Sequence, residues 1–267
     1  MISSNLINEK LRNNNFLSDI LIFDELDSTN EYLKREIKNV PDKTLAIADV
    51  QSAGKGSKGR SWSSPAGSGI WMSFMLRPDI PMHKAPMLTL VMSVSIAKAL
   101  QKLYNLPVAI KWPNDIVCSG RKLCGILSEM KQLEDGFAVI IGLGINVSVE
   151  KFSDELKERA TSIYLETGKS AKRSDIIAEI IKCFEKDYEA FIKCGDLSCI
   201  IDDYTRLSIT VGQTVKVHDL KSEYEAKVLG IGNEGQLMVE REDENGDKKR
   251  VLLYGGEVSV RGIYGYV

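Results

Sequence analysis

The chain has 267 residues, and its 35 Lys and Arg side chains nearly balance its 37 Asp and Glu side chains, which leaves a formal net charge of −2. Apolar residues make up 43% of the sequence, enough to fill a core, so the composition excludes a disordered, highly charged chain. The balanced charge also argues against a globally basic nucleic-acid binder, and any anion site must therefore be a local cluster.

Neither end of the sequence shows a targeting signal, because residues 1–20 contain no basic segment followed by an apolar stretch. The longest apolar runs, residues 85–97 and 137–149, are shorter than the roughly 18 residues that span a bilayer. We therefore expect a cytoplasmic protein without a membrane partner.

Taken along the chain, apolar runs and turn residues predict alternating strands and helices in the first 207 residues. Ser28 or Thr29 is expected to cap the first helix, and Ser174 with Asp175 the last. The predicted elements are a strand at 21–26, a helix from about 29 to 37, strands at 45–50 and 70–76, a helix at 88–103, strands at 108–111, 124–131 and 137–149, and helices at 153–159 and 176–194.

The hydropathy pattern of the sequence changes after about residue 208, where short runs alternate apolar and polar residues. Asn245-Gly246 between two such runs is a strong hairpin signal. We predict two domains, 1–207 and 208–267, the second being a small β-barrel. The runs are 214–218, 223–230, 236–240, 250–253 and 257–261.

Five cysteines are present, none in a C-x-x-C pair, and neither histidine, His83 or His218, lies near one in the sequence. Reduced, partly buried thiols are the expected state, and a structural zinc site or a Cys/His nucleophile pair is not expected. Chemistry in this chain should therefore depend on lysine, arginine, amide and backbone groups. The cysteines are Cys118, Cys124, Cys183, Cys194 and Cys199.

The stretch from Gln51 to Trp62 concentrates glycines and cations. Glycines allow successive backbone N–H groups to converge on an anion, and the basic side chains supply neutralising charge. The spacing fits neither a Walker loop nor a dinucleotide fingerprint, so a phosphate or carboxylate site and a solvated flexible loop both stay open. The residues concerned are Gly54, Lys55, Gly56, Lys58, Gly59 and Arg60.

Two further segments combine special backbone with polar groups. Lys111 ends a predicted strand before Trp112-Pro113-Asn114-Asp115, where it could stabilise a phosphoryl group or simply be a surface lysine. Gly142 and Gly144 interrupt an apolar strand, which indicates either close approach of a ligand or backbone, or a bulge. Asn146 could bond a purine edge.

Together these motifs closely resemble those of biotin–protein ligases, in the order found in that family. Each motif alone is weak, whereas their joint occurrence from about residue 20 onward is specific. The motifs are Asp27-Ser28-Thr29-Asn30, Gln51 with Gly54-Lys55-Gly56 and Gly59-Arg60-Ser61-Trp62, Lys111 to Asp115, Lys122-Leu123-Cys124-Gly125-Ile126-Leu127, Gly142-Leu143-Gly144-Ile145-Asn146, and Gly256-Glu257-Val258-Ser259-Val260-Arg261.

The resemblance implies an α+β fold, with a central mixed β-sheet flanked by helices as in class II synthetases, followed by an SH3-like barrel. It also implies two half-reactions. Biotin and MgATP form biotinyl-5′-AMP and pyrophosphate, and a lysine of a biotin carboxyl carrier protein, such as that of acetyl-CoA carboxylase, then takes the biotinyl group. A homodimer through edge strands is compatible with the family.

The resemblance also assigns site residues by position. Lys111 is the expected catalytic residue, which contacts both the biotin carboxylate and the α-phosphate. The other expected biotin-binding residues are Ser28, Thr29, Asn30, Gln51, Lys55, Gly56, Ser57, Gly125 and Leu127. The expected residues for ATP and the adenylate are Gly54, Lys55, Lys58, Arg60, Trp62, Lys111, Gly142, Gly144, Asn146 and Arg261, and no Mg²⁺ ligand is assigned.

This chain departs from the family pattern at Ser57, where a basic residue is usual, with Lys58 next to it. Either Lys58 substitutes, or the adenylate is held less tightly. Some family members also carry an N-terminal winged-helix domain, whereas only 20 residues precede the first predicted strand here, so we expect no DNA binding. The alternatives are a lipoate-type acyl-adenylate ligase and a non-catalytic biotin or nucleotide sensor.

Overall fold

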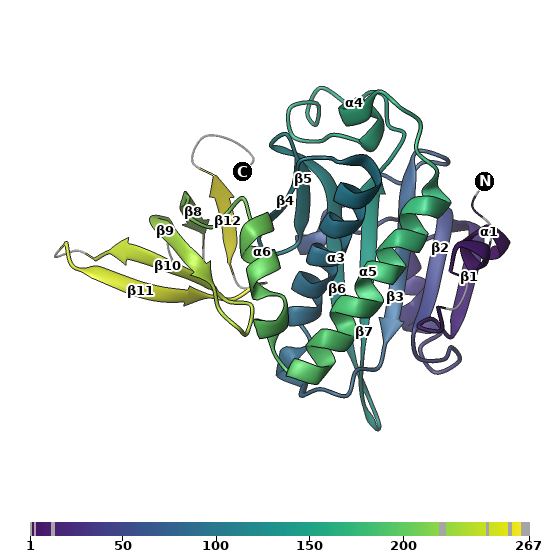
Figure 1. Cartoon of the computed structure of the whole chain (residues 1–267), viewed down its shortest axis with the longest axis horizontal. Helices are drawn as coiled ribbons and strands as arrows, with labels where there is room; N and C mark the ends of the chain where they lie inside the picture. The colour runs from purple at the N-terminus through teal and green to yellow at the C-terminus, as the bar shows by residue number, and fades with distance from the viewer. Residues whose placement is uncertain are drawn as a thin grey trace.

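The computed structural model describes residues 2, 4–11, 14–218, 223–243, 246–255 and 258–262. Figure 1 shows a large sheet crossed by two long helices, with a second, smaller group of strands from the C-terminal part of the chain at one side. The candidate site is built on the large sheet, and the order of its strands determines which residues meet there.

The large sheet has seven strands in the order β1-β2-β3-β7-β6-β5-β4. Strands β1 and β2 are parallel, and the other neighbouring pairs are antiparallel, so the sheet is mixed as predicted. Its strands are β1 (Asp19–Leu26), β2 (Thr44–Gln51), β3 (Gly69–Leu76), β4 (Val108–Lys111), β5 (Asp115–Cys118), β6 (Arg121–Leu133) and β7 (Gly136–Asn146).

The two faces of this sheet are covered differently, because side chains alternate along each strand. Ile70, Met72 and Phe74 of β3 belong to the main core with the helices α3 (Met87–Tyr104) and α5 (Arg173–Cys194), which lie across the front face in Figure 1. Met75 points to the other face, where the short helix α2 (Thr29–Arg35) packs against β2, β3 and β7. Beyond α2, this second face is open to a ligand.

Three short helices complete the large unit. The helix α1 (Ser4–Lys10) packs on α5 and β1, and α6 (Ile201–Leu207) packs on α3 and β4. The third, α4 (Ile163–Thr167), begins at Ser162, whose hydroxyl accepts a hydrogen bond from the Leu165 amide. Single 3₁₀ turns are η1 (Ser57–Gly59), η2 (Met82–Lys84) and η3 (Leu197–Cys199).

The C-terminal strands form an antiparallel sheet in the order β11-β10-β9-β8-β12, which is compatible with the predicted SH3-like barrel. A turn of this sheet docks on the large unit, where the Trp112 indole N–H donates to Gly235 O at 3.0 Å and the Leu197 amide donates to Asn233 O at 2.9 Å. The domain boundary at residues 207 and 208 stays a prediction. The strands are β8 (Thr214–His218), β9 (Glu223–Ile231), β10 (Leu237–Glu242), β11 (Lys248–Leu253) and β12 (Ser259–Gly262).

Several expected elements differ from the structure. Residues 153–159 form hydrogen-bonded turns instead of a helix, because all of them are exposed and no buried face supports helical packing. Ser28 occupies the N-cap of α2 without a capping side-chain bond. Ser174 lies inside α5, whose N-cap is Lys172. The strand β5 was not expected, and Asn245 of the predicted hairpin lies outside the described residues.

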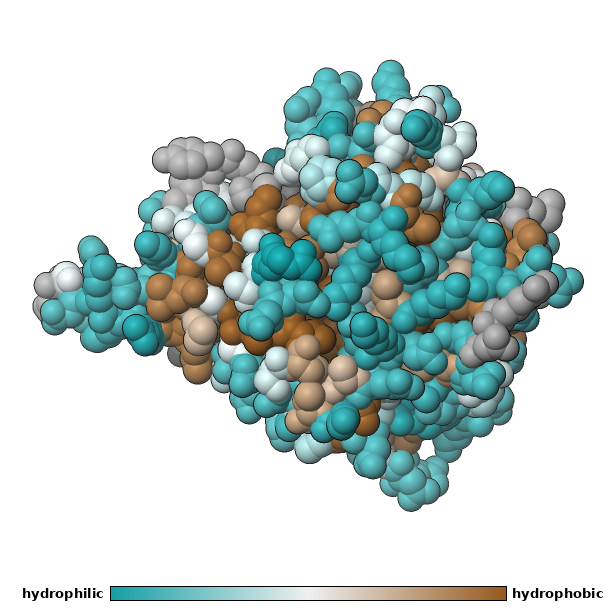
Figure 2. All heavy atoms as spheres, in the orientation of Figure 1, coloured by the Kyte–Doolittle hydropathy of each residue, from teal (hydrophilic) through white to brown (hydrophobic). Residues whose placement is uncertain are grey.

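The surface and the cysteines agree with the composition. Figure 2 shows that hydrophilic side chains cover most of the α3–α5 face, whereas hydrophobic ones gather near α6 and the strands β9 and β10. Within the described ranges, no helix is both long and apolar enough to cross a membrane. All five cysteines are free, and burial raises the pKa of Cys118 to about 11, which disfavours its reactive thiolate form.

Candidate functional site

A pocket of about 450 Å³, open to solvent, lies on the α2 face of the large sheet. The start of α2, the glycine-rich loop, and strands β6 and β7 provide most of its walls. The lining residues are Ser28, Thr29, Asn30, Gln51, Lys55, Gly56, Ser57, Trp62, Asn114, Lys122, Gly125, Ile126, Leu127, Gly142, Leu143 and Gly144.

One row of residues across the sheet explains Gly142. Ser73 of β3 and Leu127 of β6 both pair with Gly142 of β7, which makes a continuous row. The Asn30 side chain lies over this row, and a Cβ atom at position 142 would be 2.2 Å from Asn30 Oδ1. Glycine is therefore required here so that an amide can lie directly on the strand.

A second row explains Gly144. Gly144 pairs with Trp71 of β3 and with Gly125 of β6. The Trp62 indole covers the two glycines, since a Cβ at position 144 would be 2.5 Å from Trp62 Nε1 and one at 125 would be 2.9 Å from Cζ3. The register of β7 has no shift on either side, so the bulge considered from the sequence is wrong. The glycines therefore make room for two side chains of this protein, Asn30 and Trp62.

The floor of the pocket is a fixed set of polar atoms. Gln51 Oε1 accepts a hydrogen bond from the Thr29 amide at 2.9 Å, and Gln51 Nε2 donates to Ser64 Oγ at 2.9 Å. These bonds fix the amide orientation of Gln51. Thr29 and Asn30 are each only 3% exposed, so they are held rigidly at the start of α2. The floor suits a small ring that carries both donors and acceptors.

The glycine-rich loop folds back on itself beside this floor. The Gly56 amide donates to Arg60 O at 2.7 Å, and the Trp62 amide donates to Gly54 O at 2.8 Å. Gly54 has no room for a side chain, because a Cβ there would be 2.4 Å from Trp62 O. The loop thus presents Lys55, Gly56 and Ser57 to the pocket.

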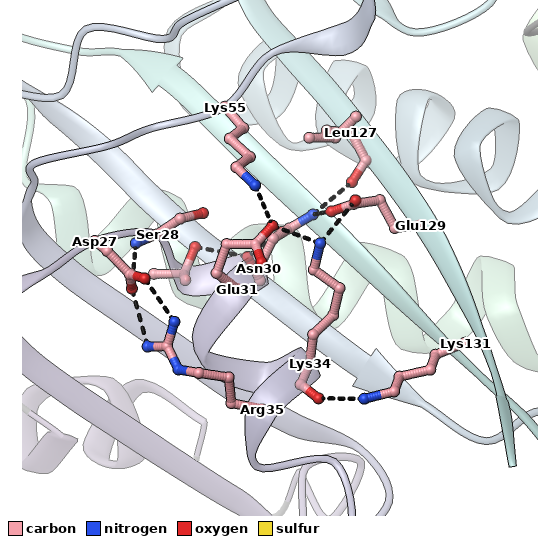
Figure 3. A network of polar contacts seen from close by, with 12 residues as sticks. Asp27, Ser28, Asn30, Glu31, Lys34, Arg35, Lys55, Leu127, Glu129 and Lys131 are labelled. Carbon is pink, nitrogen blue, oxygen red and sulfur yellow. Dashed lines mark hydrogen bonds and ion pairs between the residues drawn. The ribbon is translucent and has the colours of Figure 1, made fainter. Parts of the chain in front are cut away.

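An ion-pair network links this loop to α2 and β6 (Figure 3). Lys55 Nζ lies 2.6 Å from Glu31 Oε1. Lys34 contacts Glu31 at 2.5 Å and Glu129 at 2.9 Å. Hydrogen bonds from Lys34 and Lys55 lower the pKa of Glu31, so this carboxylate stays ionised in moderately acidic solution. The loop is therefore tied to α2 by a charge contact that a ligand anion could replace.

The lowered pKa of Glu31 predicts how this contact depends on pH. It is present at neutral pH and is lost only as the pH falls below 4.5, through the lowered pKa. We expect the amide NMR signals of Lys55 and Gly56 to be constant from pH 7 to about 5 and to shift below that range. Glu31→Gln should produce the shifted signals already at pH 7, whereas Glu36→Gln, a control at the end of α2, should not. Unchanged loop signals in Glu31→Gln would contradict this role.

Lys122 is a cation of the pocket to which sequence reasoning gave no role. Its Nζ lies 2.6 Å from Asp115 Oδ1 and 5.2 Å from the Trp62 ring centroid, over the ring face. The side chains of Lys122 and Asp115 are 20% and 15% exposed, so little water screens the pair. Trp62 Nε1 donates to no atom of the described residues. Nothing in the sequence indicates this position, because residues 122 and 125 of a regular strand would face opposite sides of the sheet, and only the register shift of the β5–β6 pairing brings them together.

The structure brings most of the predicted site residues together, with some exceptions. Lys111 lies at the end of β4, across from Asp115, and does not line the pocket. Asn146 also lies outside, where its Nδ2 donates to Thr161 O at 3.0 Å. Gly54, Lys58 and Arg60 are in the loop but do not line the cavity. The side chain of Arg261 and residues 256 and 257 lie outside the described residues. All these roles stay predictions.

Comparison with known proteins adds names to this geometry. The sequence model of the family described as "Biotin/lipoate A/B protein ligase family" matches residues 22–146. The "Bifunctional ligase/repressor BirA" of Bacillus spizizenii is 37% identical over 247 residues, 90% of this chain and 74% of that protein. A "Biotin--[acetyl-CoA-carboxylase] ligase" of Mycobacterium tuberculosis is 31% identical over 181 residues, 66% of this chain and 65% of that protein.

A solved structure shows a similar fold. It is the biotin protein ligase from Aquifex aeolicus in complex with biotin and ATP, with a TM-score of 0.78 and 30% identity. The match covers 92% of this chain and 100% of that one, so it includes both sheets. That protein binds a small acid and a nucleotide.

Proposed function

Because this chain belongs to the biotin/lipoate A/B protein ligase family, we propose that it is an ATP-dependent biotin–protein ligase. In this proposal it joins biotin and ATP to form biotinyl-5′-AMP and pyrophosphate. It then transfers the biotinyl group to a lysine of a biotin carboxyl carrier protein, such as that of an acetyl-CoA carboxylase. The relatives and the Aquifex structure, through the ligands and reactions in their names, support this function.

The observation that carries the proposal is one pocket in which a rigid polar floor lies beside two cations. Thr29, Asn30 and Gln51 form the floor, and Lys55 and Lys122 lie on the walls. A ligand that combines a polar ring with a carboxylate fits this arrangement. The Trp62 ring, which lies over Gly125 and Gly144, offers an apolar surface for the nucleotide.

The chemistry of the first step requires these cations. A carboxylate oxygen of biotin attacks the α-phosphorus of ATP, a new O–P bond forms, and the bond to pyrophosphate breaks. Two anions must approach each other, and fixed positive charge stabilises the negative charge of the transition state. We assign this role to Lys122 because it lines the pocket. The sequence-based assignment to Lys111 stays a competing prediction.

In the second step the amine of the carrier lysine attacks the acyl carbon, and AMP leaves with the electrons of the acyl–oxygen bond. No covalent enzyme intermediate is needed, which agrees with cysteines that are buried or remote from the pocket. The loop from Gly54 to Arg60 would shield the adenylate from water until the carrier arrives.

The residues present fit a Mg²⁺ ion that arrives with ATP. In the described part of the chain no group of three or more acidic, histidine or cysteine side chains could hold a metal ion by itself. Mg²⁺ is ordinarily held by one or two carboxylates together with phosphate oxygens and water, and Asp115 lies beside the pocket next to Lys122. When bound, the ion would neutralise charge on the phosphates.

Incubation with biotin, ATP, Mg²⁺ and a biotin carboxyl carrier domain tests the function, with covalent biotin on the carrier lysine as the readout. We expect biotin transfer, and biotin-dependent exchange of ATP with pyrophosphate. Lipoate-dependent exchange without biotin-dependent exchange would favour a lipoate ligase. Tight biotin binding without either exchange would favour a sensor.

Ser57 predicts how tightly the adenylate is held. The Arg60 side chain donates to Ser57 O at 3.2 Å and to Ser57 Oγ at 3.3 Å, and Lys58 is exposed, so the loop presents a hydroxyl where the family usually has a cation. We expect Ser57→Arg to release biotinyl-5′-AMP more slowly than wild type, because an added cation faces the phosphate. Rapid filtration of preformed adenylate measures the rate, with Ser57→Ala as control. Equal release rates would contradict the idea that Ser57 makes this protein hold its adenylate less tightly.

The assembly of the protein is a separate proposal. The strands β1 and β4 are the edges of the seven-stranded sheet, and family members pair such edges. Ile110 O of β4 already accepts a hydrogen bond from the Ile209 amide at 3.0 Å, so we propose a homodimer through β1, which sedimentation analysis with and without biotin and ATP would detect. A monomer under both conditions would contradict it.

A further inference from the structure

Ser73 lies outside the pocket, yet its hydroxyl joins two residues of the pocket floor. It is fully buried on β3 and does not line the cavity. Its Oγ lies 2.6 Å from Thr29 Oγ1 and 2.6 Å from Asn30 Oδ1. These three oxygen atoms form a short chain of hydrogen bonds. The direction of donation along it decides whether the Thr29 hydroxyl accepts a hydrogen bond from a ligand or donates one to it.

Glu129 sets the orientation of Asn30 (Figure 3). Asn30 Nδ2 lies 2.8 Å from Glu129 Oε2 and 3.2 Å from Leu127 O, and both of these atoms are acceptors. The amide nitrogen must therefore face them, and the amide oxygen must face Ser73. The ion pair of Glu129 with Lys34, at 2.9 Å, keeps this carboxylate in place.

The orientation of Asn30 then determines where the hydroxyl protons of Ser73 and Thr29 point. An amide oxygen only accepts, so Ser73 donates its single proton to Asn30. Ser73 has no second proton, and the 2.6 Å contact therefore requires Thr29 to donate to Ser73. The proton of Thr29 is thereby used, and its 3.2 Å contact with Gln51 Oε1 brings two acceptor oxygens together.

Two acceptors at this distance repel each other unless a donor lies next to them. For Gln51 Oε1 that donor is the Thr29 backbone N–H at 2.9 Å, whereas Thr29 Oγ1 keeps acceptor lone pairs in a pocket that Thr29 lines, where a ligand N–H can reach them. We infer that Ser73 and Glu129 are positioning residues that hold the Thr29 hydroxyl as an acceptor and thereby select a ligand whose ring presents an N–H group. The inference rests on the proposed function, in which the ligand is biotin with the two N–H groups of its ureido ring.

Two variants test this relay, by which we mean the hydrogen bonds from Thr29 to Ser73 and from Ser73 to Asn30. Ser73→Ala removes the acceptor that fixes the Thr29 proton, which can then turn to Gln51 Oε1 or into the pocket, so the Thr29 lone pairs are no longer held toward a ligand. Glu129→Gln replaces one of the two acceptors that fix the Asn30 amide by a group that can also donate, and leaves only Leu127 O to hold its orientation. An amide that turns over would reverse the bonds of the chain, so that Ser73 donates to Thr29. In each variant we expect biotin affinity, measured by titration calorimetry, to fall about tenfold, as for the loss of one well-placed hydrogen bond. The KM for biotin should rise while the KM for ATP stays unchanged.

A biotin analogue with one ring N–H replaced by N–CH₃ gives a readout that a structural role would not move. Wild type should prefer biotin over this analogue strongly, and both variants should discriminate less. The double variant should be no worse than either single one, because both residues act through the same chain. Ser93→Ala, a buried serine that bonds within its own helix, and Glu134→Gln, an exposed residue after β6, are matched controls.

The outcomes separate this inference from the proposed function. A wild-type protein that does not bind biotin would overturn the function. A wild type that binds biotin, with variants that keep its affinity and its preference over the methylated analogue, would overturn the relay. Variants that lose biotin and ATP alike, or that unfold at lower temperature without a change in discrimination, would also overturn it, since a structural role predicts that pattern.

Discussion

Lys122→Met is expected to slow biotin-dependent exchange of ATP with pyrophosphate by about 10²- to 10³-fold, the usual effect of removing a group that stabilises transition-state charge. Lys122 lines the pocket and is little exposed, so water cannot replace its charge. Thr29 and Gln51 are unaltered, and biotin binding itself should therefore weaken less than the exchange rate.

Two further lysine variants make this test specific. Lys131→Met removes a cation from the same strand, one that donates to Lys34 O at 2.8 Å outside the pocket, and should leave exchange unchanged. Lys111→Met should have a smaller effect than Lys122→Met. The reverse order would restore Lys111 as the catalytic lysine. Thermal unfolding of each variant checks that loss of the Asp115 ion pair has not unfolded the protein.

Gly142→Ala is expected to lower the free energy of unfolding by about 1–3 kcal/mol, the usual cost of overpacking a buried site. The new Cβ would be 2.2 Å from Asn30 Oδ1, and Asn30 cannot retreat without breaking its bonds to Ser73 and Glu129. Biotin affinity should fall as well, because a displaced Asn30 disturbs the floor. Urea unfolding and calorimetric titration measure the two effects.

The double variant Asn30→Ala/Gly142→Ala separates the clash from the loss of binding. Removing the Asn30 amide makes room for the Cβ, so the double variant should be more stable than Gly142→Ala alone while biotin binding stays weak. If Gly142→Ala has wild-type stability and wild-type affinity, the close packing of Asn30 on β7 contributes neither to folding stability nor to biotin binding.

Much of the large sheet was predictable, because each buried strand is a local apolar run. The run that became β3 is buried on both faces, and its bounds were predicted within one residue. Prediction was wrong where tertiary contact decides local structure. Residues 153–159 have helix-forming composition but no surface to pack on, and β5 is too short to show a pattern and exists only between β4 and β6.

The residues of the candidate site were also predictable only in part. The glycine-rich loop and the start of α2 were predictable, because motif residues adjacent in sequence stay adjacent in the fold. Lys111 and Lys122 were harder to separate, since each lies at the end of a strand. Only the register shift of the β5–β6 pairing, between Ile116 and Val117, brings Lys122 to the same face of β6 as Gly125, next to Trp62. Ser73 and Glu129 belong to no motif and became visible only through their contacts with Asn30.

The docking of the C-terminal turn on Trp112 has a thermodynamic consequence for the pocket. Trp112 bonds Gly235 O, and two residues later Asn114 lines the cavity and exchanges hydrogen bonds with Ile126 at 2.8 and 2.9 Å. One short rigid segment therefore contacts both the ligand pocket and the second sheet. A ligand that fixed Asn114 more firmly would strengthen the docking of that sheet, and by reciprocity the docked sheet would then raise ligand affinity by the same factor.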